Sequence, residues 1–307
     1  FTNSRLKDYP IRTENFRVKT VAEFGKDVKA VEMSSLGSEG SPVNMSVGIL
    51  GATAANPVTV KVDLGNGETK PFQIKEERPA TPNIVTTRTG AGNIIIYVPQ
   101  DKYVTSLESN GQYIDNIDLS ALTELRILTL KNASLTTIDL SYNNKLEKLD
   151  LSNNQLRRVD LRGPSSYFNK SNLTDINISH NQIDSLLYYT IYGVTKLNVS
   201  HNNLNKLDLK DADNLRMLDI SYNKFTRLLL NHSELIEDVN VANNELTEIG
   251  IPTVAPVKKL NISGNYFTLA NMPNDFGLSR GNFIYAPQHV LQISTSSPGI
   301  DLSEQYI

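Results

Sequence analysis

A frame of five fixed positions, LxxLxLxxNxL, recurs through the middle of this sequence and constrains its fold more than any other feature. Residues 146–156 fit the frame without exception. The intervals between successive starts are 21, 27, 21, 21, 21 and 21 residues, for copies that begin at Leu125, Leu146, Leu173, Val194, Leu215, Ile236 and Val257. One copy cannot bury its apolar side chains alone, whereas stacked copies share a continuous core. The frame therefore predicts a solenoid.

Each copy is expected to form a short strand at its LxL segment, because alternate residues there point inward. Strands of successive copies then pair in parallel about 4.8 Å apart. The repeated Asn is expected to turn inward and bond backbone groups where the chain leaves the strand. We expect Asn202 to contribute more stability than Asn265, which lies near the end of the array. The second half of each copy, as in residues 136–141, predicts a second short strand or extended turn, since 21 residues leave no room for a full helix.

This pattern resembles the leucine-rich-repeat superfamily, in particular the bacterial 21-residue class called IRREKO, with consensus LxxLxLxxNxLxxLDLxxNxx. The resemblance covers residues 114–267, and Ala133 departs from it by replacing the first Asn. It implies a mainly β fold in which a right-handed solenoid with short parallel strands and little helix follows the N-terminal module.

Residues 1–100 predict that module to be a β-sandwich. Residues 58–62 alternate apolar and polar, Asn66-Gly67 indicates a hairpin turn, and residues 94–98 form a β-branched run. Residues 62–67 resemble the hairpin of PKD or Ig-like modules in bacterial surface proteins. We therefore expect a sandwich over 1–100 that caps the solenoid, and about seven repeats plus a half-repeat over 101–285. Residues 268–307 leave the frame, and residues 286–307 are expected to form a tail or a linker to a further domain.

Composition and motifs exclude several classes of function. The chain has 30 Lys+Arg against 33 Asp+Glu, so it lacks the basic face that a nucleic-acid partner requires. It has 0 Cys, which excludes disulfides, Cys-ligated zinc and thiol nucleophiles. No nucleophile elbow, P-loop or HExxH motif is present, and no stretch approaches the ~18 apolar residues of a membrane helix. We expect no enzyme activity, no cofactor, no bound metal and no transmembrane segment.

Binding information is expected in the outward positions of the repeat strands, because packing dictates the inward ones. We name three columns that are expected to face solvent. The charged column is Ile127, Lys148, Asp175, Lys196, Met217, Asp238 and Lys259; the amide column is Thr129, Asp150, Asn177, Asn198, Asp219, Asn240 and Asn261; the serine column is Lys131, Ser152, Ser179, Ser200, Ser221, Ala242 and Ser263. Alternating charges in the charged column are expected to pair laterally at the surface.

A six-residue insertion within residues 163–171 adds two aromatic side chains beside these columns. Aromatic anchors within a polar rim are typical of protein interfaces. The candidate ligand-binding residues are Lys148, Asp150, Tyr167, Phe168, Asp175, Asn177, Lys196, Asn198, Met217 and Asp219. The alternative is that the columns only keep the sheet soluble and that the rings fold back over the next copy. An apolar patch of Leu187, Tyr189 and Leu229 is a second possible surface.

Two further groups could hold a cation. Asp118, Asp139 and Asp160 fall in register, which suits a Ca²⁺ chain. Alternatively, these residues follow the repeat consensus and pair with cations such as Arg158 and Arg162. His180 and His201 occupy one frame position in neighbouring copies, so they form either the start of a metal site or a stacked surface pair.

Together these features favour an extracellular module for protein interaction or adhesion that is either secreted or attached to the outer membrane at the cell surface. The chain resembles multidomain surface proteins of anaerobic gut and oral bacteria, which implies a protein or glycan ligand, including one derived from a host. The alternatives are a structural spacer that projects other domains from the cell and a hydrolase.

Overall fold

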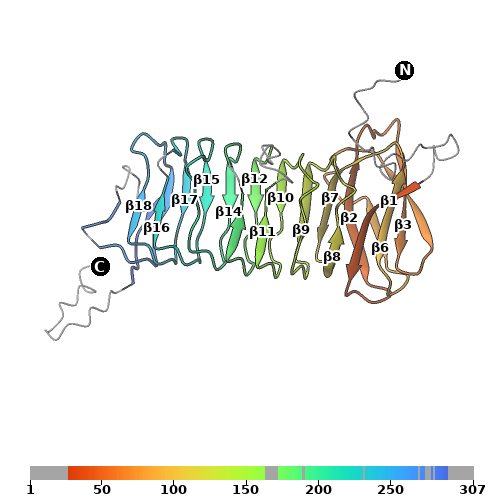
Figure 1. Ribbon diagram of the computed structural model, residues 1–307, viewed down its shortest axis with the longest axis horizontal. Helices are drawn as coiled ribbons and strands as arrows, with labels where there is room; N and C mark the ends of the chain where they lie inside the picture. The colour runs from red at the N-terminus through yellow and green to blue at the C-terminus, as the bar shows by residue number, and fades with distance from the viewer. Residues whose placement is uncertain are drawn as a thin grey trace, which may run out of the picture.

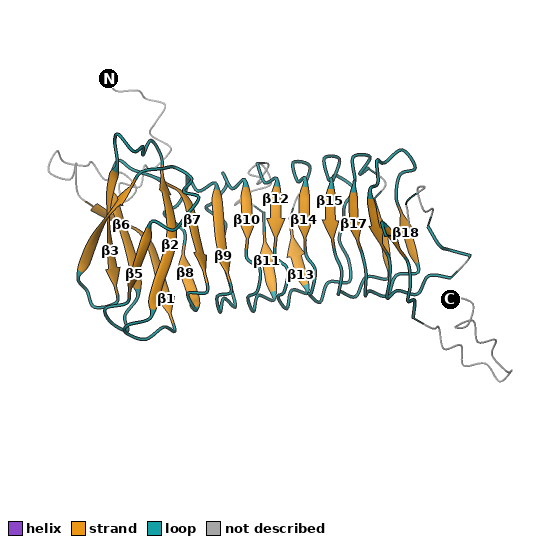
Figure 2. Ribbon diagram, turned by 180° about the vertical axis from the view of Figure 1, so that it is seen from behind, coloured by secondary structure: helices purple, strands orange, loops and turns teal. Residues whose placement is uncertain are grey.

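The computed structural model describes residues 27–162, 172–188, 191–230, 232–268, 270–273, 278 and 281–289. An antiparallel β module at one end continues into an elongated stack of repeat turns (Figures 1 and 2). The part of the chain that the structure describes contains no helix. The predicted fold class, an N-terminal β module followed by a parallel β solenoid, is thus confirmed.

The N-terminal module consists of two antiparallel sets of strands that share one hydrophobic core. A five-stranded sheet has the order β4-β3-β6-β1-β8, and β5, β2 and β7 pair in a second sheet. The strands are β1 (Asp27–Ser35), β2 (Pro42–Ile49), β3 (Val58–Leu64), β4 (Thr69–Ile74), β5 (Ile84–Thr87), β6 (Ile94–Pro99), β7 (Val104–Asn110) and β8 (Ile114–Asp118). Along β3, Val60 and Val62 are buried while Thr59 and Lys61 are exposed, so the alternation in the sequence marks the core face.

The second sheet does not end with the module. Strand β7 pairs antiparallel with β2 on one side and parallel with β9 (Ile127–Lys131) on the other. Leu107 of β7 lies opposite Leu128 of β9 and precedes it in the sequence by one period of 21 residues. Residues 104–119 are therefore a degenerate first copy, with Ser109 and Gln112 where later copies have Leu and Asn. The solenoid and the module share one eleven-stranded sheet, here called the long sheet.

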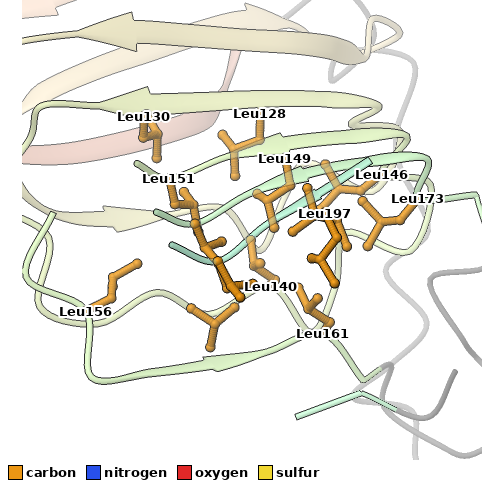
Figure 3. Close-up of a cluster of buried hydrophobic side chains, with 14 of the residues drawn as sticks. Leu128, Leu130, Leu140, Leu146, Leu149, Leu151, Leu156, Leu161, Leu173 and Leu197 are labelled. Carbon is orange, nitrogen blue, oxygen red and sulfur yellow. The ribbon is translucent and has the colours of Figure 1, made fainter. Parts of the chain in front are cut away.

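The long sheet runs parallel from β7 to its far end, with each repeat adding one strand. The repeat strands after β9 are β10 (Lys148–Asp150), β12 (Asp175–Asn177), β14 (Lys196–Asn198), β15 (Met217–Asp219), β17 (Asp238–Asn240), β19 (Lys259–Asn261) and β20 (Phe283–Ile284). Leucines of neighbouring copies, such as Leu128, Leu149 and Leu197, point into one interior (Figure 3), and each is at most 2% exposed. This burial is the continuous core that the frame predicts.

Strand β20 extends the array beyond the last copy found in the sequence. It pairs parallel with β19, so that Leu260 lies opposite Phe283. The Gln288 Nε2 donates to the Ile262 carbonyl at 3.0 Å, and its Oε1 accepts from the Phe267 N–H at 3.2 Å. Gln288 thus replaces the repeat Asn. The prediction that the frame stops at residue 267 was wrong, because the terminal copy keeps the backbone bonds but not the residue types. Residues 290–307 of the predicted tail lie outside the described residues.

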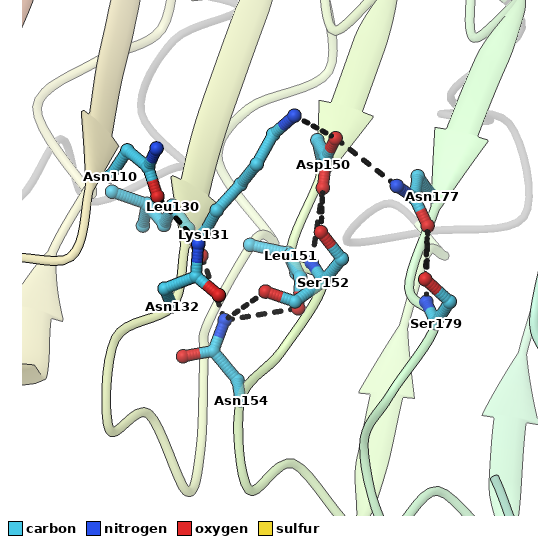
Figure 4. A network of polar contacts seen from close by, with 10 residues as sticks. All are labelled: Asn110, Leu130, Lys131, Asn132, Asp150, Leu151, Ser152, Asn154, Asn177 and Ser179. Atoms are coloured by element: carbon cyan, nitrogen blue, oxygen red, sulfur yellow. Dashed lines mark hydrogen bonds and ion pairs between the residues drawn. The ribbon is translucent and has the colours of Figure 1, made fainter. Parts of the chain in front are cut away.

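The repeat Asn side chains bond the backbone of two copies at once, as predicted. Asn202 Nδ2 donates to the carbonyls of Ile178 and Val199, both at 3.0 Å, and its Oδ1 accepts from the Ile183 N–H at 2.9 Å. Asn154 bonds in the same way (Figure 4). Asn265 makes the matching set and is 0% exposed, since the copy containing β20 covers it. The structure therefore favours equal contributions from Asn265 and Asn202, unlike the expectation from the sequence.

The second halves of four copies form short strands on the opposite side, as the sequence suggested. β11 (Arg158–Asp160) pairs with β13 (Ser185–Leu187), and β16 (Arg227–Leu229) pairs with β18 (Glu248–Gly250). Between these pairs Tyr188 occupies an inward position that is leucine in neighbouring copies. Its hydroxyl accepts from the Asp208 N–H at 2.8 Å and donates to the Asp208 carbonyl at 2.6 Å. The phenol thus bonds backbone groups of a kind that strand pairing satisfies between β11 and β13 and between β16 and β18. Burial raises the pKa of Tyr188 to about 12.

The residue before each repeat Asn turns the chain out of the strand with a positive φ. The series is Gly111, Asn132, Asn153, His180, His201, Tyr222, Asn243 and Gly264, with φ from 50° to 74°. This left-handed conformation favours Gly and Asn, the residues found in most copies. This left-handed position was not identified from the sequence, although the recurrence of Gly and Asn at it indicates a positive φ.

Candidate functional site

A groove of about 500 Å³ lies on the outer face of the long sheet, over strands β12 to β20. Its sides are the charged and amide columns, which stand two residues apart on every strand. The register places equivalent residues of neighbouring copies opposite one another, for example Lys196 beside Met217 and Asn198 beside Asp219. A surface of this size, with polar groups converging on it, has the dimensions of a ligand site.

Six of the predicted binding residues line this groove: Asp175, Asn177, Lys196, Asn198, Met217 and Asp219. Lys148 and Asp150 lie one strand away on β10, and Asp150 forms an ion pair with Lys131 at 2.9 Å. Tyr167 and Phe168 lie outside the described residues, as does Tyr189. The groove extends further toward the C-terminus than the predicted set, to Asp238, Asn240, Lys259, Asn261 and Ile284.

The amide column is held rigid by hydrogen bonds to its own strand. Asn198 Oδ1 accepts from the N–H and the hydroxyl of Ser200, at 3.0 and 2.7 Å. Asp219 is bonded to Ser221 in the same way, at 2.9 and 2.6 Å. Asp150 and Asn177 repeat the arrangement (Figure 4). Because one oxygen is fixed, the second polar atom of each side chain has a defined direction across the sheet.

The serine column from Ser152 to Ala242 does not face solvent, so the prediction was wrong there, whereas Lys131 and Ser263 at its two ends are partly exposed. Ser152, Ser179, Ser200 and Ser221 are only 3–4% exposed. Their hydroxyls donate to the amide column, which explains why a small hydroxyl residue recurs there. These serines support the groove from below and are not available to a ligand.

The charged column also differs from its prediction. Lys148 lies opposite Asp175, Asp175 opposite Lys196, and Asp238 opposite Lys259. Among the described residues none of these opposite charges comes within the 4.0 Å of an ion pair. Elsewhere in the solenoid the same lateral spacing gives ion pairs, such as Arg126–Glu147 at 3.1 Å and Arg216–Glu237 at 2.9 Å. Among the described residues, the groove therefore presents charges that have no ion-pair partner.

A stack of three rings lies at the turn that follows the amide column. The His180 and His201 centroids are 4.0 Å apart, and those of His201 and Tyr222 are 4.1 Å apart, both with 13° between the ring planes. The hypothesis of neighbouring histidines is thus confirmed as a stacked pair. No group of three metal-ligating side chains occurs within the described residues.

The stability of this stack is expected to fall in acid. Burial, and then the His180 ring, lower the pKa of His201, while Asp219 acts in the opposite direction. The folded chain therefore binds this proton less readily than the unfolded chain. Its free energy of unfolding should fall as pH drops through the ordinary histidine pKa of about 6.5. Urea unfolding of wild type and of His201→Asn between about pH 7.5 and 5.5 measures this change. The free energy of unfolding should fall less in the variant than in wild type. An equal loss in both proteins would contradict the assignment.

The three aspartates in register bond their own turns rather than a shared cation. Asp118 accepts from the Ser120 N–H at 2.9 Å, and Asp139 accepts from the Ser141 N–H at 2.9 Å. Asp160 pairs with Arg162 at 2.7 Å, as the sequence suggested. Each carboxylate thus has a local partner, and this geometry favours the structural interpretation over a Ca²⁺ chain.

Comparisons with known proteins find one family profile and several solved structures that are similar to parts of this chain. The leucine-rich-repeat family profile matches residues 145–167. No curated protein matches this chain in sequence. Among solved structures, a leucine-rich-repeat protein of Leptospira interrogans is 20% identical with a TM-score of 0.40, and 50% of this chain covers 41% of that one. The InlJ functional domain of Listeria monocytogenes is 20% identical (TM-score 0.29), with 58% of this chain covering 52% of it. An internalin, InlF, from the same species is 18% identical (TM-score 0.33), with 53% covering 62%. The chain thus spans less than two thirds of each.

Proposed function

We propose that this leucine-rich-repeat protein, with its repeat of about 21 residues, is a binding module that holds a protein or glycan ligand in the groove of the long sheet. The observation that carries the proposal is the coincidence of that groove with the two columns of variable outward side chains. Inward positions are dictated by packing and the Asn position by backbone bonds, so partner-specific information has to lie in these columns.

The same arrangement supports binding rather than catalysis. The groove side chains from the charged and amide columns are lysines, aspartates, asparagines and one methionine, spread along the solenoid axis instead of gathered around one reacting atom. Rigid polar groups on a regular scaffold provide hydrogen bonds at low entropic cost, which favours recognition. Tyr167 and Phe168 stay candidates for aromatic anchors at the edge of this surface.

We place this activity outside the cell, on the surface or in secreted form, with a module over residues 1–100 and a solenoid over residues 101–285 as its two parts. The long sheet joins the described strands of both parts, which supports their acting together. No helix in the described ranges is long and apolar enough to cross a membrane.

Filling the groove tests the proposal. Met217 is 42% exposed at the centre of the groove, and Leu229 is 37% exposed on β16, away from it. Met217→Trp is expected to weaken binding to hits from peptide and glycan arrays at least about tenfold, while the matched control Leu229→Trp leaves binding unchanged. Hits that withstand both Met217→Trp and the pair Tyr167→Ala with Phe168→Ala would place the ligand elsewhere, with Leu187 and Leu229 the next surface to test.

A further inference from the structure

The order of charges along the groove indicates which charge pattern a ligand needs in order to bind there. Along the charged column the order from β12 to β19 is acidic, basic, apolar, acidic, basic: Asp175, Lys196, Met217, Asp238 and Lys259. Charges that could pair laterally but do not are available to a partner whose charges alternate in the opposite sense. A neutral ligand would leave all of them without a counter-charge.

We propose that the groove binds an extended polypeptide segment that lies along the solenoid axis. Every second residue of this segment is charged, and these charges alternate between basic and acidic. This rests on the proposed function and narrows it to one class of partner. Four strand steps separate Asp175 from Lys259, which is about 19 Å at about 4.8 Å per step. An extended chain advances about 3.3 Å per residue, so about six residues span that distance. Side chains on one face of such a segment recur about every 6.6 Å, which lets successive side chains meet charges one to two strands apart.

A basic side chain of the bound segment fits the centre of the groove. Met217 provides an apolar surface there, with Asp219 on the same strand and Asp238 on the next. Asp219 Oδ1 is held by Ser221, while Oδ2 accepts from Asn240 Nδ2 at 3.0 Å. Unlike Asp150, which Lys131 neutralises, Asp219 has no cation within ion-pair distance among the described residues. A lysine or arginine can lay its aliphatic stem on Met217 and place its charge between the two carboxylates.

Two labelled synthetic peptides of identical composition provide the test. The alternating peptide is Arg-Gly-Glu-Gly-Arg-Gly-Glu and the block peptide is Arg-Gly-Arg-Gly-Glu-Gly-Glu. Fluorescence anisotropy on the full chain is expected to show at least about tenfold tighter binding of the alternating peptide, with an affinity that falls as salt is raised.

A charge swap that preserves net charge supplies the matched variant. The double change Asp238→Lys with Lys259→Asp is expected to weaken binding of the alternating peptide at least about tenfold. The control swap Arg227→Glu with Glu248→Arg exchanges a pair that is 2.9 Å apart on the other side of the solenoid, and it should leave binding unchanged. Thermal melts by circular dichroism verify that both variants fold.

Equal affinity for both peptides, no binding of either, or indifference to the Asp238/Lys259 swap would overturn the alternating-charge proposal. An array hit that is lost with Met217→Trp but insensitive to the swap would keep the proposed function while overturning this narrower one. A hit that is insensitive to both changes, and also to Tyr167→Ala with Phe168→Ala, would overturn both proposals.

Discussion

Replacing Leu218 with alanine is expected to lower the free energy of unfolding by about 2–5 kcal/mol. Leu218 is 2% exposed and lies on β15, between β14 and β17, so its side chain packs against the inward residues of two other copies. Truncation removes the transfer free energy of the buried methyl groups and leaves a cavity that the stacked strands on either side cannot close. Urea unfolding monitored by circular dichroism measures the change.

The neighbouring Met217 supplies the control for this prediction. It is one residue away on the same strand but 42% exposed, so Met217→Ala should change the free energy of unfolding by no more than about 0.5 kcal/mol. Similar losses at both positions would show that the inward and outward faces of β15 are assigned incorrectly.

Asn202→Ala is expected to cost about 1–3 kcal/mol, because it leaves buried carbonyls and a buried N–H of two copies without partners. Alanine keeps the backbone but supplies neither donor nor acceptor. The same measurement on Asn265→Ala should give a similar loss, since Asn265 makes the matching bonds and is covered by the copy that contains β20.

Asn203 is the matched control, since its exposed side chain makes no hydrogen bond within the described part of the chain. Asn203→Ala should stay within about 0.5 kcal/mol of wild type. If Asn265→Ala is much milder than Asn202→Ala, the terminal copy does not stack as described.

Much of the fold follows from local periodicity. The LxL alternation alone separates inward from outward residues, and the 21-residue period alone brings Lys196 beside Met217 and His180 beside His201. These relations could be predicted because in a solenoid each contact repeats between nearest neighbours, so one correct frame determines all of them. The same logic predicts six residues of the groove from the sequence alone.

The ends of the array could not be predicted in this way. The copies at β7 and β20 depart from the consensus at the position that identifies a repeat, where Gln112 and Gln288 replace Asn. Their membership depends on pairing with β9 and β19 and, for β7, on antiparallel pairing with β2 about 60 residues earlier. No local pattern records such a pairing.

The sequence by itself determined the solenoid, its strand register and the columns that a ligand can meet, because inward and outward positions follow from the period of the chain. Only the tertiary structure decided which outward side chains are available. It buried Ser200 beneath Asn198, neutralised Asp150 with Lys131, and gave Asp238 and Lys259 no ion-pair partner in the part of the chain that the structure describes. Burial and ion pairing depend on distances of a few ångströms between side chains of different copies, and a frame of residue types does not contain those distances.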